Sequence, residues 1–436
     1  AVHAVGFWLS FGAVALLMLV GRQQQHLPAW RQGVQLQLAL SALLLPLTLG
    51  FFERASWVSP FANLLAVPLV TFVVVPLGLL GLLLWPVAPE AADTLWQLAM
   101  HVLTALDALL AEFQQWPAAS VDWSLPGRAG VFWAVLAVFC LCQPVAPRLR
   151  LLAPFFLLPL LLLHQPPAPG QLRVTVLDVG QGLAVLVEAG RYRLLYDTGP
   201  AFGDSDAGRR IVLPALRQAG VGALDHLLLS HDDLDHTGGA ASILDGLPVH
   251  EGIGAPPSRY AGAPLPPWRA CDAGIFWMRA GWRFEVVHPD AGAQAAFTRD
   301  NDRSCVLRVS RGGRALLLPG DLERHSEAWL LTNMPAAGLR SDVLVLGHHG
   351  SRQASSAAFL EQVAPTLAIA SAGYRNSYGH PAVVVRERLT AQGIPLLNTA
   401  DSGALRFELG PAGVTGLSQW RVADRRYWRH PPPDLP

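Results

Sequence analysis

The residues best suited to chemistry lie in one short loop, SHDDLDHTGG at 230–239. The apolar run LDHLLL comes directly before it, which predicts a buried strand that gives the loop a rigid mount. So many charged side chains repel one another or leave lone pairs unsatisfied unless a cation lies among them. The alternative is a solvated acidic loop. The imidazole and carboxylate groups belong to His231, Asp232, Asp233, Asp235 and His236.

The same arrangement recurs along the second half of the chain. Several predicted strands end in a side chain that could bind a metal. A recurrence of this kind is difficult to assign to chance, and it argues against the solvated loop. It predicts a site along one edge of stacked sheets. The residues are Asp197 after RYRLLY, His231 after LLLS, His288 after FEVV, Asp321 after LLLPG and His348 after LVLG.

These residues divide into two ligand sets, which predicts two divalent metal ions. Such a pair generates hydroxide near neutral pH and stabilises both the attacking and the leaving oxygen of a phosphoryl displacement. The ligands permit Zn²⁺, and their many carboxylates make Mn²⁺ the alternative. Asp321 and Asp235 are candidate catalytic residues because they would fix the pair of ions. One set is His231, Asp233 and His288, the other is Asp235, His236 and His348, and Asp321 is left as a bridge.

Further polar residues have more than one interpretation. Asp197 is predicted to hold a ligand imidazole or the loop. His349 and His380 are candidates for phosphate contact or for protonation of the leaving group, although both could be ordinary surface histidines. Asn301 and Ser304 precede a predicted strand. They could donate hydrogen bonds to phosphate oxygens or only cap a turn.

The elements that position these residues lie at 172–416. Short apolar strands come in runs with helices between them, which is not a regular βαβ repeat. Two mixed sheets covered by helices, an αββα sandwich, fit this order best. The tail at 417–436 is rich in Arg, aromatic residues and Pro. It could meet phosphates and stack on bases, or be solvated. The tail residues concerned are Arg421, Arg425, Arg426, Tyr427, Trp428 and Arg429.

The first half, residues 1–165, has the composition of a polytopic membrane domain. A simple anchor needs one span, and this half predicts about five or six helices, which favours a conduit. Residues 91–115 predict an amphipathic helix. Prolines interrupt the run at 55–89 and often mark a broken helix that lines a cavity. Residues 166–171, in HQPPAPGQ, form a Pro-rich linker. The other apolar runs are 5–20, 34–52, 129–142 and 149–163.

The placement of arginines predicts the topology. Arg22 and Arg31 flank one loop, and Arg148 and Arg150 another, so both loops are predicted to be cytoplasmic. If residues 91–115 cross the membrane, the C-terminal domain is extracytoplasmic. If that helix lies on the membrane surface, the number of membrane crossings between the two arginine-flanked loops is one too few for both loops to be cytoplasmic.

Charge and cysteines give weaker information. The formal net charge is zero, so there is no basic footprint of a nucleic-acid binder. Cys140 and Cys142 lie in an apolar segment, and Cys271 and Cys305 are far apart. The spacing predicts neither a disulfide framework nor a metal knuckle. The chain begins without Met, and we expect it to be the C-terminal part of a longer protein.

The motifs resemble those of a known family. HDDLDH is similar to the H-x-H-x-D-H signature of the metallo-β-lactamase superfamily, with Asp233 where the second His usually stands. LDVGQG, YDTG, GD at 320–321 and GHHGS at 347–351 resemble segments of the C-terminal domain of ComEC-type DNA-uptake proteins. In that family Asp often follows VGQG; Leu183 stands here, so it receives no ligand role. GFWLSFGAVALL and SPFANLLAVPLV resemble the family's competence membrane domain.

This resemblance implies a bacterial inner-membrane channel that passes single-stranded DNA into the cytoplasm during natural transformation. The attached metallo-hydrolase domain, placed outside the cytoplasm, would degrade the non-transported strand. Within GHHGS, Ser351 becomes a residue that supports a ligand or contacts substrate. The implied partners are single-stranded DNA, the lipid bilayer, the missing N-terminal part of the same protein and other DNA-uptake proteins.

Two rival interpretations remain open. The hydrolase-like domain could be degenerate and only guide DNA, which Asp233 and Leu183 favour. Alternatively, the chain could be a membrane-tethered metallo-hydrolase of a small substrate. The near-zero charge favours that reading, because a DNA nuclease is expected to have a basic groove.

Overall fold

The structure, a computed structural model, divides into two compact units, Ala1–His164 and Gln165–Pro436. Each unit is described by itself. The described residues are 5–21, 28–52, 54–116, 119–122, 127–142, 147–162, 165–258, 260 and 264–423.

The first unit is helical. In its described part, three helices are long and apolar enough to cross a membrane: Arg31–Gly50, Ser59–Leu84 and Pro89–Gln114. The amphipathic segment expected at 91–115 is the third of them. A short antiparallel pair, β1 (Arg54–Ser56) with β2 (Ser120–Asp122), joins two loops. The helices are α1 (Val5–Gly21), α2 (Ala29–Phe52), α3 (Ser59–Leu69), η1 (Val70–Val74), α4 (Val75–Leu84), α5 (Pro89–Gln114), α6 (Gly127–Cys142), η2 (Pro147–Leu152) and α7 (Ala153–Leu162).

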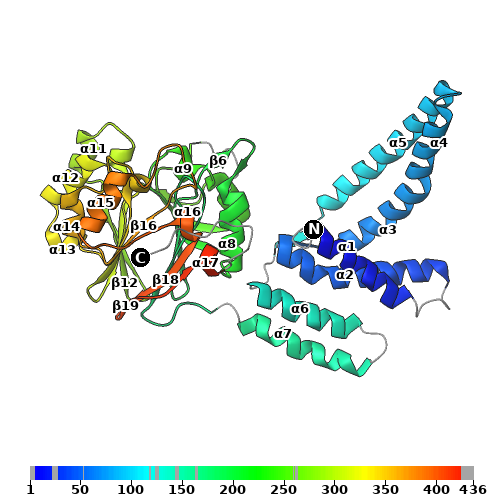
Figure 1. Cartoon of the computed structure of the whole chain (residues 1–436), viewed down its shortest axis with the longest axis horizontal. Helices are drawn as coiled ribbons and strands as arrows, with labels where there is room; N and C mark the ends of the chain where they lie inside the picture. Colours follow the sequence, from blue (N-terminus) through cyan, green and yellow to red (C-terminus); the bar gives the residue numbers. More distant parts are fainter. Residues whose placement is uncertain are drawn as a thin grey trace. The chain divides into compact units, whose positions relative to one another are not determined.

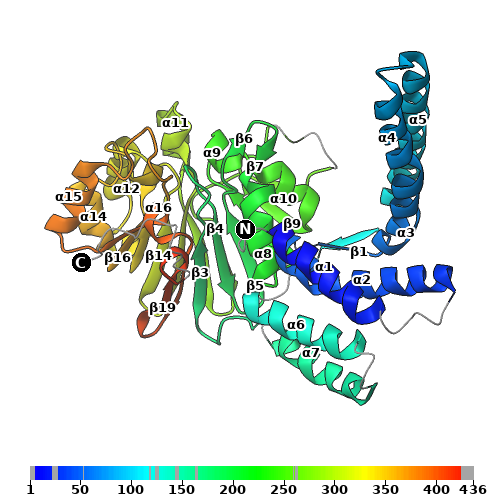
Figure 2. The same ribbon diagram turned by 45° about the vertical axis from the view of Figure 1, so that its right-hand side comes forward.

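The prolines do not break the second of these spans. A π-helical turn, η1, lies between Pro68 and Pro76 and carries the helix from α3 into α4. Such a turn accommodates the missing proline N–H while the helix continues. Helix α5 packs closely beside α4 (Figures 1 and 2), and Trp96 Nε1 donates to the Gly78 carbonyl at 3.2 Å. A Cβ at Gly81 would meet the Trp96 ring at 2.3 Å, so only glycine allows this approach.

The second unit contains two facing sheets. The eight-stranded sheet has the order β10-β9-β8-β5-β4-β3-β18-β19, and the seven-stranded sheet runs from β11 to β17 in sequence order. The strands of the eight-stranded sheet are β3 (Leu172–Val176), β4 (Val185–Ala189), β5 (Tyr192–Tyr196), β8 (Leu224–Leu229), β9 (Val249–Gly254), β10 (Trp268–Arg269), β18 (Leu405–Gly410) and β19 (Gly413–Gln419). In the second sheet they are β11 (Phe276–Arg279), β12 (Trp282–His288), β13 (Val306–Arg311), β14 (Arg314–Leu318), β15 (Val343–Val345), β16 (Leu367–Ala370) and β17 (Leu396–Asn398).

Helices cover both outer faces, as Figure 2 shows. The inner faces share one core, to which Tyr196, Phe284 and Phe407 contribute. Two further cores lie under the outer helices. This confirms the predicted αββα sandwich. The remaining elements are β6 (Ala201–Phe202), β7 (Ser205–Asp206), η3 (Gly208–Val212), α8 (Leu213–Gln218), α9 (Leu234–Thr237), α10 (Ala240–Gly246), α11 (Ala291–Ala296), η4 (Asn301–Arg303), α12 (Arg324–Asn333), α13 (Ala336–Leu339), η5 (Gly347–Gly350), α14 (Ala357–Val363), α15 (Val383–Ala391), α16 (Thr399–Ser402) and α17 (Trp420–Ala423).

Strand direction brings the polar loops to one edge. Strands β5 and β8 are parallel, and Asp197 and His231 follow them. Strands β14 and β15 are parallel in the facing sheet, and Asp321 and the 347–351 turn follow those. Because the carboxyl ends of parallel strands meet at the same edge, the loops of each sheet converge there.

The expectation for the cysteines needs revision. Cys271 and Cys305 form a disulfide, with 5.8 Å between their Cα atoms, although their spacing predicted none. They become neighbours only once strands have paired. In the tail, Arg421 forms an ion pair with Asp178. The tail residues Arg425, Arg426, Tyr427, Trp428 and Arg429 lie outside the described residues.

Candidate metal centre

The structure brings together Asp235, His236, Asp321 and His349, whose potential ligand atoms all lie within 4.8 Å of one another. His236 Nε2 lies 3.0 Å from Asp321 Oδ1, and His349 Nε2 lies 3.1 Å from Asp235 Oδ2. His236 Nε2 and Asp321 Oδ1 are buried, and apart from this contact with each other, which lacks hydrogen-bond geometry, neither atom has a partner. Buried polar atoms are normally satisfied. A divalent cation among these four residues would satisfy both atoms, so the donor set fits a metal ion.

Outer hydrogen bonds orient the two imidazoles. His236 Nδ1 donates to Asp197 at 2.8 Å, and Asp197 also accepts from the Ser230 backbone N–H and hydroxyl. His349 Nδ1 donates to the Ser371 carbonyl at 2.9 Å. Each ring therefore turns Nε2 toward the group, as metal-binding histidines require. The hydrogen bond from His236 to Asp197 is the contact that the predicted supporting role of Asp197 requires. The role of Ser371 left no signal in the sequence, because a backbone carbonyl is common to all residues.

The structure places only one of the two adjacent histidines in the four-residue group. His348, predicted as a ligand, lies with Nδ1 3.1 Å from Glu323 Oε1 and Nε2 3.6 Å from Asp321 Oδ2. His349, predicted to contact substrate, is the one in the four-residue group. Both residues are left-handed, with φ of 49° and 57°. This backbone costs on the order of 1–3 kcal/mol per residue, and it sends the neighbouring rings to different partners.

The other predicted ligand set is incomplete. His231 Nε2 lies 3.4 Å from Asp233 Oδ2, and the side chain of Asp233 is 51% exposed. His288 is elsewhere: it is fully buried, and its Nε2 donates to the Asp302 carbonyl at 2.9 Å. A register shift in β12 between Val286 and His288 accompanies this orientation, and such bulges re-aim side chains. Among the described residues, His231, Asp233 and His288 are therefore not brought together as a group of close ligand atoms.

The other predicted residues surround the centre in different ways. Ser304 is buried, and its hydroxyl accepts from the Asp321 N–H at 3.1 Å, so it positions that carboxylate. Asn301 lies half-buried in η4. Ser351 is buried, and its hydroxyl accepts from the Gln353 N–H at 3.4 Å. The His380 ring centroid lies 6.4 Å from that of His349.

The electrostatics of the centre are strongly coupled. Burial alone would lower the pKa of His236, but Asp321 and Asp197 raise it well above its usual value. Burial would likewise raise the pKa of Asp321, but His236 and His349 hold it well below its usual value. Burial, followed by His349 and His348, lowers the pKa of His380 to about 4. His380 is therefore neutral near pH 7, which argues against an imidazolium that protonates a leaving group.

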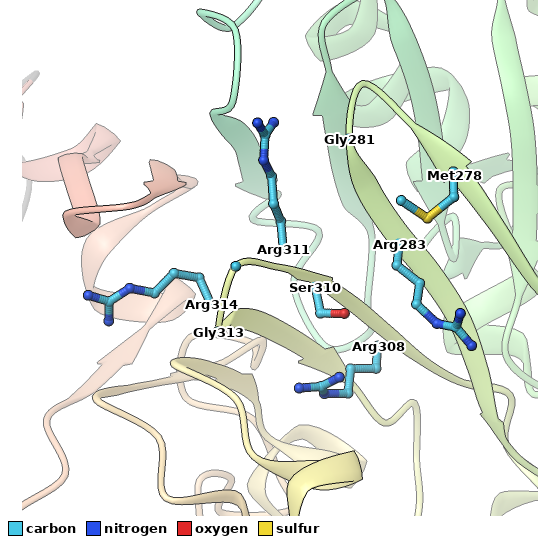
Figure 3. Close-up of a pocket in the computed structure, with 9 residues that line it drawn as sticks. Met278, Gly281, Arg283, Arg308, Ser310, Arg311, Gly313 and Arg314 are labelled. Carbon is cyan, nitrogen blue, oxygen red and sulfur yellow. The ribbon is translucent and has the colours of Figure 1, made fainter.

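A pocket lies at the opposite ends of the strands from the metal centre, around the β13–β14 turn. Its volume is about 390 Å³, and Arg283, Arg308, Arg311 and Arg314 line it. Figure 3 shows that these guanidinium groups point away from one another. Arg283 pairs with Glu285, Arg314 with Asp342, and Arg311 donates to the Ala280 carbonyl. The arginines therefore do not converge on one anion.

The fold and the His/Asp centre define the class of the second unit. Residues 177–374 match the metallo-beta-lactamase superfamily. A mutant metallo-beta-lactamase from Cronobacter sakazakii aligns at 16% identity over 52% of this chain and 98% of its own, with a TM-score of 0.31. CmlA, a diiron beta-hydroxylase from Streptomyces venezuelae, aligns at 13% identity over 68% and 65%, with a TM-score of 0.35.

Residues 1–148 match the competence protein family. Competence protein ComA of Neisseria gonorrhoeae is 39% identical over 99% of this chain and 59% of its own length. Recombination protein 2 of Haemophilus influenzae is 32% identical over 92% and 55%. The chain thus spans somewhat more than half the length of these relatives. The resemblance predicted from the motifs is confirmed: a region that matches the competence protein family, with helices long and apolar enough to cross a membrane, is followed by a metallo-β-lactamase superfamily domain.

Proposed function

We propose that this chain is part of a DNA-uptake channel of the inner membrane, and that its metallo-β-lactamase domain is a metal-dependent nuclease. The nuclease would degrade the strand that is not transported. One observation carries the hydrolytic part of this proposal. In the four-residue group of Asp235, His236, Asp321 and His349, two buried ligand atoms, His236 Nε2 and Asp321 Oδ1, face each other at 3.0 Å without a hydrogen bond of normal geometry. The competence region supports DNA as the substrate.

The same four residues would hold the metal ion, either Zn²⁺ or Mn²⁺. A bound ion would supply Lewis-acid stabilisation of phosphoryl oxygens and a source of hydroxide near neutral pH. His231 and Asp233 offer a second and weaker position, since His288 does not complete it. We therefore expect one tightly bound ion, and a second only at higher metal concentration.

The chain's own residues would prepare the site and hold the substrate. Asp197 and Ser371 hold the rings of His236 and His349 in one orientation, so no reorganisation is needed on binding. Neutral His380 can donate one hydrogen bond to a phosphate oxygen. Its Nδ1 lies 3.3 Å from the Gln181 amide, which holds the ring beside the centre.

The domain would lie outside the cytoplasm. The Cys271–Cys305 disulfide supports this location, because disulfides persist in oxidising compartments and are rare in the cytosol. The arginines that flank the predicted cytoplasmic loops agree with it. A reporter enzyme that works only outside the cytoplasm should be active when it is fused after residue 170. Activity of a reporter that works only in the cytoplasm, fused at the same place, would contradict this topology.

A non-catalytic guide for DNA is the second candidate function. The incomplete side of the centre favours it, since Asp233 is half exposed and His288 Nε2 is engaged by the Asp302 carbonyl. A guide would bind DNA without needing the metal ion for hydrolysis.

The test uses the full chain in detergent with Mn²⁺ or Zn²⁺ and labelled single-stranded DNA beside small phosphodiesters. We expect metal-dependent DNA cleavage that falls more than about 100-fold in Asp321→Asn and Asp235→Ala, beyond the loss typical of an outer-shell partner. Asp232→Asn is the matched control. Asp232 is an exposed carboxylate of the same loop and lies outside the four-residue group. Full metal occupancy without DNA cleavage would exclude the nuclease and leave the guide.

A further inference from the structure

The loop Ser371–Pro381 carries two exposed aromatic side chains beside the metal centre. Tyr374 is 53% exposed and Tyr378 is 68% exposed. Neither is needed by the core or by the metal group. We propose that Tyr374 and Tyr378 form a stacking platform for the unpaired bases of single-stranded DNA. This inference rests on the proposed function, since it names a contact of that substrate.

The loop is anchored directly to the metal centre. Its first residue, Ser371, accepts through its carbonyl from His349 Nδ1 at 2.9 Å and donates through its hydroxyl to the Gly182 carbonyl at 2.7 Å. The Gly373 N–H donates to Gln181 Oε1 at 3.2 Å. A base held on this loop would therefore have a defined position relative to the His349 imidazole.

Asn376 keeps the rest of the loop in one shape. Its amide nitrogen donates to the carbonyls of Gly373 and His380, at 2.9 and 2.7 Å. Its amide oxygen accepts from the His380 N–H at 2.8 Å. The two tyrosines project from this clamped segment. A preorganised aromatic surface loses little conformational entropy on binding, which favours a stacking role.

A row of rings connects the platform to the centre. The Tyr378 ring stacks on the His380 ring, with 5.6 Å between centroids and 27° between planes. The His380 centroid lies 6.4 Å from that of His349 and 5.8 Å from that of His348. A strand whose base stacks on Tyr378 would pass its adjoining phosphates toward the metal ligand His349.

The platform also carries a positive charge. Arg375 is exposed, and its guanidinium lies 5.3 Å from the centroid of the Tyr374 ring. An Arg beside an aromatic ring can meet a phosphate while the ring meets the base, which is how single-stranded nucleic acid is bound without sequence preference. Bases of a duplex have no free faces, so the expected ligand is an unpaired strand.

The test compares single-stranded DNA with an abasic strand of the same length, both with phosphorothioate links that resist hydrolysis. Dissociation constants are measured by fluorescence anisotropy with the metal-loaded full chain in detergent. Stacking of about 1–3 kcal/mol per base corresponds to roughly 5- to 150-fold in Kd. We expect Tyr374→Ala and Tyr378→Ala each to weaken binding of the normal strand within this range. Both Tyr→Phe variants should retain the wild-type affinity.

The abasic strand separates stacking from general damage. It should bind more weakly than the normal strand to the wild type, and the double Tyr→Ala variant should no longer distinguish them. Phe276→Ala is the matched control, because Phe276 is also 53% exposed and has a guanidinium, that of Arg283, over its ring. It should bind like the wild type. Unchanged Kd values in the Tyr→Ala variants, or equal losses for both strands, would overturn the platform.

The proposed nuclease can fail separately. Binding that depends on the tyrosines, without cleavage of an ordinary phosphodiester strand, would support the platform and exclude the nuclease. Cleavage that is unchanged by substitution of both tyrosines would support the nuclease and exclude the platform. A chain that binds neither strand would exclude both.

Discussion

Two sets of candidate metal ligands share the loop at 230–239, and the structure brings only one of them together in a four-residue group. On one side, Asp235 and His236 meet Asp321 and His349 from the facing sheet. On the other side, His231 meets only the half-exposed Asp233 at 3.4 Å. Both sides begin with a His and an Asp of the same motif. They differ in the third element, since His349 reaches the centre and His288 hydrogen-bonds the Asp302 carbonyl instead.

This difference shows that a candidate ligand must be present in the motif and must also be held in position by neighbouring groups. On the complete side, Asp197 and the Ser371 carbonyl fix the rings of His236 and His349. On the incomplete side, His231 Nδ1 contacts the Ser230 hydroxyl at 2.9 Å, and His231 Nε2 has no hydrogen bond beyond its 3.4 Å contact with Asp233. The following predictions test whether the two sides differ as the geometry indicates, from the largest effect on metal binding to the smallest.

Asp197→Asn should weaken metal binding by about 10- to 100-fold, because the carboxylate that orients the His236 ring is lost. Competition with a metal-binding dye measures the affinity. Asp232→Asn should leave it within about twofold, since Asp232 lies outside the group. An Asp197→Asn variant that binds metal like the wild type would show that the complete side needs no support.

Metal affinity should rise with pH by up to about tenfold per unit around neutrality, because one proton must leave His236. The sign follows from the raised pKa of His236: Asp321 and Asp197 favour the protonated imidazole in the metal-free protein, and the ion competes with that proton. Titrations between pH 6 and 8 measure the slope. A flat profile would mean that His236 is already neutral before the ion binds.

Asp233→His should favour a second ion by a few-fold, on the order of 1 kcal/mol, because an imidazole replaces a half-exposed carboxylate. Metal content measured by mass spectrometry over a range of metal concentrations reports the stoichiometry. If occupancy stays at one ion, the position of His288 limits this side more than the identity of residue 233.

His288→Asn should reduce the free energy of unfolding by about 1–3 kcal/mol, through loss of a buried hydrogen bond, while metal affinity stays within about twofold. Denaturant unfolding and dye competition measure the two effects. A loss of affinity as large as that expected for Asp197→Asn would show that His288 binds metal after all.

Local sequence patterns were sufficient to predict the strands and the polar residues that follow them. Alternating and continuous apolar runs predicted the strands, and the polar residues at their ends identified Asp197, His231, Asp235, His236 and Asp321. These predictions depend on which residues are buried, and burial follows from hydrophobicity along the chain. The choice between His348 and His349 was not accessible, because their left-handed backbone is imposed by the loops packed around them.

Contacts between distant segments were decided by the tertiary structure alone. The Cys271–Cys305 disulfide, the clamp of Asn376 on its loop and the turn of His288 toward Asp302 all require paired strands or packed loops. The sequence by itself determined a membrane half, an αββα sandwich and a loop that calls for a cation. Which imidazoles face that cation was decided only by the tertiary structure, because side-chain direction depends on strand register and turn conformation.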